Sequence, residues 1–322
     1  MPTPNLVWDQ HTCLPLRPDA NVELLTRYAR PGGCFTSVNV GYSPHSGSEV
    51  HALLDAFQHA VATHPLLDLA VTVNDVRSVT TEGRIAVAFD LEDSAALGDD
   101  LDALHVLAQR GVRAMLPTYN HANAAGCGCL DTDDTGLTTW GRDLVAEMNA
   151  AGVVVDGSHC SARTGLDLCD VSEAPVIYSH SCLQSVWQHP RNITDDQARA
   201  CAATGGVVGI TGVGIFLGPN SATLEAMVRH LEVAVELVGV NHVGVSTDFA
   251  FDHADFGAEL AANPELFDDS YIRWGPIEFM PPEVFLGLDD ALASRGWPND
   301  DITAVLSGNF MRVAEQTWPR AS

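Results

Sequence analysis

The chain has 322 residues, of which 16 are basic and 42 are acidic, and its formal net charge is −26. Such a charge repels the phosphates of nucleic acids and of anionic membranes, so neither is expected as a partner. No run of about 18 uncharged apolar residues occurs, and we therefore expect no transmembrane helix. All 16 basic residues are arginine, which excludes a Schiff-base lysine, a P-loop lysine and a carbamylated lysine between two metal ions.

Eight cysteines are scattered along the chain without an evident disulfide framework. Cys127-Gly-Cys129 lacks the spacing of a CxxC motif, and no second pair completes a structural zinc site. The first residues contain neither a basic segment nor a long apolar segment of the kind that directs secretion. We therefore expect reduced thiols and a cytoplasmic location.

Eight short apolar runs follow one another along the chain, each of a length that suits one buried strand. They cover residues 6–11, 34–41, 84–91, 112–119, 153–159, 174–180, 206–213 and 242–249. Amphipathic stretches lie between them, among them 48–64, 99–111, 138–152, 195–206 and 223–239. Apolar strands that alternate with helices indicate a parallel sheet with both faces covered. Eight such units predict the α/β class and a (β/α)8 TIM barrel, with residues 1–322 as a single domain.

The pattern loosens after the eighth run. Residues 250–284 are rich in proline, aspartate and aromatic residues, which indicates a long loop or lid over the mouth of the barrel. Residues 289–297 and 307–318 have helical patterns and are predicted to close the fold.

Polar residues follow several of the eight runs at their carboxyl ends, where barrel enzymes keep their chemistry. The fifth and sixth runs both end in Ser-His, which makes His159 and His180 the clearest pair. The full set of strand-end residues is His11 with Cys13, Glu92, Tyr119 with Asn120, His159, His180 and Asp248. A single histidine at a strand end is usually a hydrogen-bonded core residue, but several at one barrel mouth favour a metal site.

The chemistry of this set suits zinc, which binds imidazole and carboxylate groups and keeps an open position in catalytic sites. Two ions about 3.5–4 Å apart can share a hydroxide and stabilise a tetrahedral intermediate. Glu92 could bridge such ions, and Asp248 could carry the proton from the nucleophile to the leaving amine. Arg191 follows the sixth strand, and its guanidinium suits bidentate capture of a substrate carboxylate. A surface salt bridge is the competing interpretation for this arginine.

Several ordered motifs resemble the membrane dipeptidase (renal dipeptidase) family of metallopeptidases, a group of the amidohydrolase superfamily. They are GLTTWGRDLVAEMNAAGVVVDGSHCS (136–161), APVIYSHS (174–181), HPRN (189–192), HVGVSTDF (242–249) and SGNFMRV (307–313). LPTYNHANAAGCGC (116–129) is similar to the bacterial branch of that family.

The resemblance implies a role for each residue of the set. His11 and the residue two positions on would bind a first zinc ion, Glu92 would bridge, and His159 and His180 would bind a second ion. Tyr119 stands where relatives place a substrate-binding residue, and the adjoining Asn120 is expected to contribute to substrate binding. Arg191 would hold the C-terminal carboxylate of a dipeptide, and Asp248 would be the acid and base.

Two departures from the family pattern stand out. The family has His-x-Asp in its first motif, whereas this chain has His11-Thr12-Cys13. The Cys13 thiolate could replace the aspartate with a longer bond to zinc, or Cys13 could be an inert thiol beside a weak or empty first site. Glu92 is followed by Asp93-Ser94 where the family often has Gly-Gly, which would narrow the pocket.

The sequence therefore predicts a hydrolase with one or two zinc ions, in which a metal-bound hydroxide cleaves a dipeptide or related amide with a free carboxylate. The alternative is a family member that is no longer a peptidase, a binding protein or a lyase or isomerase, with its first metal site altered by Cys13. A phosphotriesterase-like site is disfavoured because the chain has no lysine, and a deaminase-like site because residue 13 is not histidine. Barrel enzymes commonly pair, so a homodimer is a possible assembly.

Overall fold

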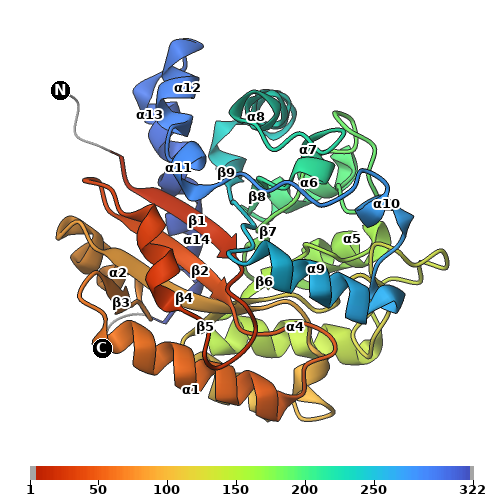
Figure 1. The fold of residues 1–322 in the computed structure, drawn as a ribbon. Helices are drawn as coiled ribbons and strands as arrows, with labels where there is room; N and C mark the ends of the chain where they lie inside the picture. Colours follow the sequence, from red (N-terminus) through yellow and green to blue (C-terminus); the bar gives the residue numbers. More distant parts are fainter. Residues whose placement is uncertain (1–4, 320–322) are drawn as a thin grey trace.

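The computed structural model describes residues 5–319 and contains eight parallel strands in a barrel arrangement (Figure 1). Neighbouring strands pair in the order β1-β2-β4-β5-β6-β7-β8-β9. A parallel bridge between Cys13 and Ala250 joins the segment after β1 to the segment after β9. The predicted α/β barrel is therefore confirmed. The strands are β1 (Val7–Thr12), β2 (Cys34–Asn39), β4 (Ile85–Leu91), β5 (Val112–Met115), β6 (Val154–Asp156), β7 (Val176–Tyr178), β8 (Val207–Ile210) and β9 (Val243–Val245).

A ninth short strand, β3 (Leu67–Leu69), was not predicted. It pairs with the first half of β4, whereas β5 pairs with the second half of the same strand. Three residues with a central aspartate are too short and too polar to stand out from a loop by hydrophobic pattern.

The barrel helices begin at capping residues that satisfy their free N–H groups. Ser46, Thr72 and Thr194 form capping boxes at the starts of α1, α2 and α6. Three helices, α2, α5 and the short α7, fall where the sequence pattern indicated none. The helices of the barrel are α1 (Gly47–Thr63), α2 (Val73–Thr81), α3 (Asp102–Gln109), α4 (Thr139–Ala151), α5 (Ala162–Val171), α6 (Asp195–Ala203), α7 (Gly214–Leu217) and α8 (Leu224–Val238), with short 3-10 turns η1 (Val22–Tyr28), η2 (Ala95–Leu97) and η3 (Val240–His242).

The C-terminal part of the chain holds the predicted lid and closing helices. Residues 250–284 are more helical than expected, and α9 lies close to the arrowhead of β1 (Figure 1). The elements are α9 (His253–Ala262), η4 (Pro264–Leu266), α10 (Asp269–Ile272), α11 (Pro282–Phe285), α12 (Leu288–Ser294), α13 (Asn299–Thr303), the π turn η5 (Ala304–Gly308) and α14 (Asn309–Thr317).

Helix α14 fills the end of the barrel opposite the carboxyl ends of the strands. Its Phe310 packs in one buried cluster with Trp8, Phe35 and small strand residues. A Cβ atom on Gly244 would lie 2.4 Å from the Phe310 ring, so only glycine fits at this position of β9. This packing closes one end of the barrel and leaves the other end for polar groups.

None of the helices within residues 5–319 has the length and apolar character needed to cross a membrane.

A buried carboxylate connects β1 to the segment that follows β9. Asp9 accepts hydrogen bonds from Tyr28 Oη at 2.6 Å, from Thr247 Oγ1 at 2.6 Å and from the Thr247 backbone N–H at 2.8 Å. Buried polar groups cost free energy unless they are paired, and here each oxygen of the carboxylate has donors. The interaction fixes the backbone immediately before Asp248.

We expect Tyr28→Phe to lower the free energy of unfolding by about 1–3 kcal/mol, because it leaves the buried Asp9 carboxylate with one donor fewer. Urea unfolding followed by circular dichroism measures the change. Ser294→Ala, which removes an exposed hydroxyl on α12, should change the value by less than about 0.5 kcal/mol. Equal effects of the two substitutions would contradict the role given to this network.

Candidate metal centre

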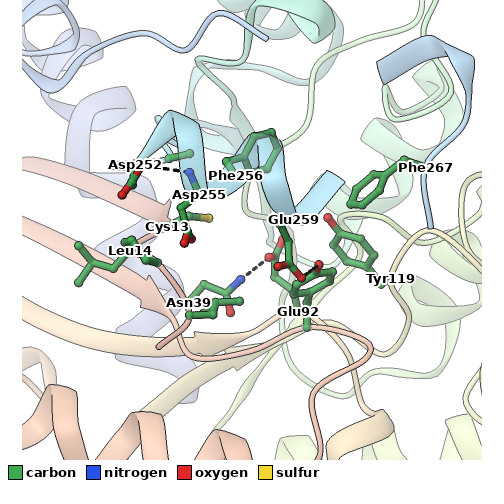
Figure 2. Close-up of a pocket in the computed structure, with 14 residues that line it drawn as sticks. Cys13, Leu14, Asn39, Glu92, Tyr119, Asp252, Asp255, Phe256, Glu259 and Phe267 are labelled. Atoms are coloured by element: carbon green, nitrogen blue, oxygen red, sulfur yellow. Dashed lines mark hydrogen bonds between the residues drawn. The ribbon is translucent and has the colours of Figure 1, made fainter. Parts of the chain in front are cut away.

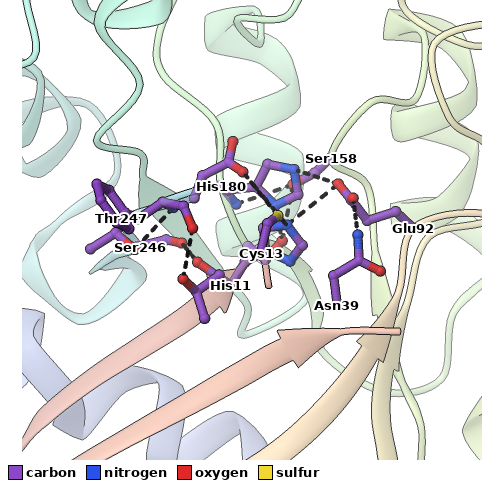
Figure 3. Close-up of polar contacts among 12 residues, drawn as sticks. His11, Cys13, Asn39, Glu92, Ser158, His180, Ser246 and Thr247 are labelled. Carbon is purple, nitrogen blue, oxygen red and sulfur yellow. Dashed lines mark hydrogen bonds and ion pairs between the residues drawn. The ribbon is translucent and has the colours of Figure 1, made fainter. Parts of the chain in front are cut away.

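One carboxylate oxygen lies near three imidazoles that come from the carboxyl ends of different strands, and Figure 3 shows Glu92 beside two of these residues, His11 and His180. Glu92 Oε1 is 3.5 Å from His11 Nε2, 3.3 Å from His159 Nε2 and 3.4 Å from His180 Nε2. All four side chains are buried. The residues that the strand pattern placed at one barrel mouth are therefore brought together.

Each imidazole is oriented by a hydrogen bond at its other nitrogen. His11 Nδ1 lies 2.9 Å from Asp90 Oδ1, and His159 Nδ1 lies 2.7 Å from Asn120 Oδ1. His180 Nδ1 lies 2.6 Å from the hydroxyl of Ser179. Such partners fix the ring so that Nε2 faces the centre, which is the usual arrangement around a metal-binding histidine.

A second group of donors adjoins the first through His11. Cys13 Sγ lies 3.4 Å from His11 Nε2 and 3.8 Å from Asp248 Oδ1, and His11 Nε2 lies 3.6 Å from Asp248 Oδ1. Within residues 5–319, His11, Glu92 and His180 form one compact group of potential ligands, and His11, Cys13 and Asp248 form another.

The donor set fits zinc. Ligand atoms at tetrahedral angles on bonds of about 2.0–2.3 Å lie roughly 3.3–3.8 Å apart, which is the range of the distances between these donor atoms. His180 Nε2 is buried and has no hydrogen-bond partner within the described residues. A buried nitrogen without a partner is costly, and a cation at this point would satisfy it.

Burial shifts the pKa values of these groups strongly. Desolvation raises the pKa of Glu92 to about 8, that of Asp248 to about 6 and that of Cys13 to about 12. Burial also lowers the pKa values of His159 and His180 well below the usual range, so both imidazoles are neutral and able to bind a metal. A divalent cation would reverse the upward shifts of the carboxyl and thiol groups, because it favours their charged forms.

His11 differs from the other two histidines. Burial disfavours its charged form, but the negative charges of Asp90, Glu92 and Cys13 outweigh this effect and hold its pKa well above the usual value. The same acidic groups that favour a proton on His11 would favour a metal cation beside it.

Two residues of the site have a left-handed backbone. His159 has φ 62° and Asp248 has φ 50°. This region is uncommon for residues other than glycine, and such conformations cluster at functional sites where the surrounding structure enforces them.

A single buried carboxylate aligns the two Ser-His segments. Asp156 Oδ1 accepts hydrogen bonds from the backbone N–H of Ser158 at 2.9 Å and of Ser179 at 3.1 Å. Ser158 Oγ in turn accepts from the backbone N–H of His180 at 3.2 Å. The histidines that follow β6 and β7 are therefore held in a fixed position relative to each other.

The three residues predicted to bind substrate lie around the same centre. The ring of Tyr119 stacks on His159 with centroids 4.0 Å apart. Arg191 is buried and donates to the backbone oxygen of His180 at 2.9 Å, and its Nε has no partner within residues 5–319. Asn120 is fully engaged: besides His159, its side chain contacts Tyr271 Oη at 3.2 Å and the backbone oxygen of Leu266 at 2.8 Å.

The Asp93-Ser94 pair does not narrow the site as expected. Asp93 accepts from the Tyr119 backbone N–H at 2.8 Å, and Ser94 Oγ donates to the Pro117 oxygen at 2.6 Å. Both side chains face the loop after β5 and line neither of the pockets beside the metal centre. They hold the Tyr119 segment in place instead.

Several residues of the site were missed by sequence reasoning. Asp90 and Asn39 lie on strands and orient His11 and Glu92, the latter through a hydrogen bond from Asn39 Nδ2 to Glu92 Oε2. Their signal was present as polar residues within otherwise apolar runs, since a buried strand seldom carries them without a partner.

Two pockets meet at the centre. The outer pocket opens from Cys13 and Glu92 toward α9, and the inner pocket lies between Asp248, His159 and the lid. Glu92 lines both pockets, so a substrate in either of them would lie beside the metal centre.

The fold and this donor set define a (β/α)8 barrel of the metal-dependent amidohydrolase type. The chain belongs to the membrane dipeptidase family, peptidase family M19, whose model matches residues 26–263.

Similar proteins agree with this assignment. An uncharacterized dipeptidase of Schizosaccharomyces pombe is 33% identical over 250 residues, which cover 76% of this chain and 60% of that protein. Dipeptidase verJ of Clonostachys rogersoniana is 33% identical over 202 residues, covering 62% of this chain and 50% of verJ. The chain thus spans only half to three fifths of the length of these relatives. An amidohydrolase structure from Pseudomonas aeruginosa superposes with a TM-score of 0.87 at 26% identity, covering 98% of this chain and 97% of that one.

We expect Asp90→Ala to weaken zinc binding by about 10–100-fold, because His11 loses the hydrogen bond that orients its ring. Competition with a chromophoric chelator measures the affinity, and the melting temperature reports whether the fold is retained. Asp170→Ala, on the exposed surface of α5, serves as the control for lost charge. Unchanged zinc affinity in folded Asp90→Ala protein would remove this carboxylate from the site.

Proposed function

We propose that the protein is a zinc-dependent dipeptidase that hydrolyses a dipeptide or a related amide with a free carboxylate. The observation that carries the proposal is that Glu92 Oε1 lies 3.3–3.5 Å from the Nε2 atoms of three histidines at the carboxyl ends of three strands. Membership of a dipeptidase family and the dipeptidase relatives support the reaction class.

The proposed zinc ligands are His11, Cys13 and Glu92 for a first ion, and Glu92, His159 and His180 for a second. Zinc, when bound, lowers the pKa of water and polarises the carbonyl group of the substrate. The remaining chemistry belongs to side chains of the barrel mouth.

Asp248 is the proposed proton carrier. Its carboxylate lies at the edge of the centre, 3.6 Å from His11 Nε2, and borders the inner pocket. There it can take a proton from the attacking water and deliver it to the nitrogen of the leaving amine. The strained backbone of Asp248, fixed by the neighbouring contacts of Thr247 with Asp9, keeps the carboxylate in this position.

Arg191 is the proposed anchor for the substrate carboxylate. Its guanidinium is buried beside His180 with an unpartnered Nε, and a carboxylate would both satisfy that group and compensate its charge. Tyr119 provides an aromatic wall next to His159. The contacts of Asn120 support a positioning role through His159 rather than direct substrate binding.

The alternative of a family member without peptidase activity is not favoured. It depends on loss of the first site through Cys13, yet the Cys13 thiol lies among the other donors at distances that suit a shared ion.

We expect Asp248→Asn to retain its zinc but to lose turnover by a factor of about 10²–10⁴, because the amide cannot accept the proton. Metal analysis of protein purified without chelator and initial rates with L,L-, L,D- and Gly-D-dipeptides test both parts. Asp143→Asn, on the exposed face of α4, is the control. Retained turnover in Asp248→Asn would exclude this residue from the reaction.

We expect Cys13→Asp to bind zinc at least as well as the native chain and to hydrolyse dipeptides at an equal or higher rate. The carboxylate removes the longer zinc–sulfur bond and donates less charge to the ion. Cys13→Ser should lose zinc from the first site, and Cys169→Ser, on α5, should lose none. Unchanged zinc content and rate in both Cys13 variants would show that position 13 lies outside the site.

A further inference from the structure

The outer pocket has an unusual lining (Figure 2). Four aromatic rings border it, those of Tyr42, Tyr119, Phe256 and Phe267. The charged residues of its lining are all acidic, namely Glu92, Asp252, Asp255 and Glu259. Aromatic faces and carboxylates both attract cations, so this pocket favours a positively charged group.

The two aspartates at the rim share one arginine. Arg17 Nη1 lies 2.5 Å from Asp255 Oδ1, and Arg17 Nη2 lies 3.8 Å from Asp252 Oδ2. All three side chains are substantially exposed, with 37–48% of their surface accessible. Arg17 also pairs with Asp19, so it compensates the two rim aspartates only in part, and water screens the remaining charge.

Glu259 on α9 is different. It is half-buried and accepts hydrogen bonds from the neutral groups Tyr42 Oη and Asn263 Nδ2, the latter at 2.9 Å. Within residues 5–319 it forms no ion pair. These two neutral donors fix its carboxylate at the pocket wall and leave its negative charge for a ligand.

Glu259 is linked to the metal centre by a row of aromatic contacts. Its hydrogen-bond donor Tyr42 lies next to Tyr119, with ring centroids 5.0 Å apart, and Tyr119 stacks on His159. The α-amine of a dipeptide is two bonds from the scissile carbonyl carbon, whereas the end of a long side chain extends farther into the outer pocket.

We propose that Glu259, with the rings of Tyr42, Phe256 and Phe267, selects substrates whose N-terminal residue carries an ammonium or guanidinium side chain. This inference rests on the proposed dipeptidase function. In that function Arg191 holds the C-terminal carboxylate on the side of His159 and His180. The N-terminal residue then extends toward Cys13 and Glu92, into the outer pocket.

The test compares two substrates whose side chains have the same number of carbon atoms and differ in the terminal ammonium group. Lys-Ala and norleucyl-Ala are hydrolysed by the zinc-loaded full chain, and kcat/KM is measured for each. We expect a preference of about tenfold for Lys-Ala, the value of one charge-assisted contact. Glu259→Gln keeps the size and polarity of the side chain and should bring the ratio close to one. The control Glu278→Gln removes an exposed lid charge outside the outer pocket and should preserve the ratio.

Two additional comparisons isolate the charge of Glu259 and the side chain of the substrate. Tyr42→Phe breaks the hydrogen bond to Glu259 but keeps the charge of Glu259, so the preference for Lys-Ala should persist. If Tyr42→Phe and Glu259→Gln both lose hydrolysis of Lys-Ala and of norleucyl-Ala to the same extent, Glu259 is only a lid contact and the proposal is overturned.

A second comparison uses substrates with a blocked α-amine. Nα-acetyl-Lys-Ala should retain its advantage in kcat/KM over Nα-acetyl-norleucyl-Ala, and loss of that advantage would assign the contact to the α-amine instead.

Failure of the dipeptidase function remains distinguishable. If the protein hydrolyses none of these dipeptides, the proposed function fails, while calorimetric titration of the zinc-loaded protein with Lys-Ala and norleucyl-Ala still measures the preference. Equal affinities there, or equal kcat/KM values in the native enzyme, would overturn the assignment of Glu259.

Discussion

The position of the Glu92 carboxylate among three imidazoles constrains the rest of the barrel mouth. Four side chains that can carry charge are buried together there, and burial of such groups costs several kcal/mol each unless they are paired. The hydrogen bonds of Asp90, Asn120 and Ser179 satisfy the outer nitrogens of the histidines. The inner nitrogens and the carboxylate oxygen are left facing one another. This arrangement is destabilising when the site is empty, and a bound cation would stabilise it.

This constraint explains why the supporting groups are themselves polar and buried. Asp156 serves two backbone N–H groups at once, so the segments that carry His159 and His180 cannot shift independently. Asp9 does the same for β1 and the segment that carries Asp248. The carboxyl ends of these strands are thus stabilised by a connected polar network, while the opposite end is filled by Trp8, Phe35 and Phe310. One end provides the apolar core, and the other holds the site.

The strand-end residues could be predicted from the sequence because the carboxyl ends of all strands in a parallel barrel lie at the same end of the barrel. Residues that follow successive apolar runs are therefore expected to lie close together. The pattern of apolar runs ending in His159, His180 and Glu92 was sufficient for that step. It could not reveal β3, since three residues carry too little pattern, nor the sharing of Asp156 by two segments, since hydrogen-bond partners 23 residues apart leave no periodic signal. The lid itself was predicted, but its helices were not, because prolines, aspartates and glycines interrupt residues 250–284 and α10 and α11 have only four residues each.

The lid, more than the metal centre, shapes the pocket that would select the substrate. The donors of the metal centre lie on the strand ends and would serve any amide, whereas Tyr42 and Glu259 join the loop after β2 to α9 and shape the outer pocket. Groups on the rigid strand ends determine which reaction the site can perform. A residue on a surface helix can be replaced during evolution without displacing those groups. The acidic character of the outer pocket is therefore largely a feature of the lid, to which Asp252, Asp255 and Glu259 belong. The buried guanidinium of Arg191, in contrast, lies beside His180 at the strand ends. A substrate with a carboxylate at one end and a cationic side chain at the other matches both charges, while one without the cation leaves Glu259 uncompensated.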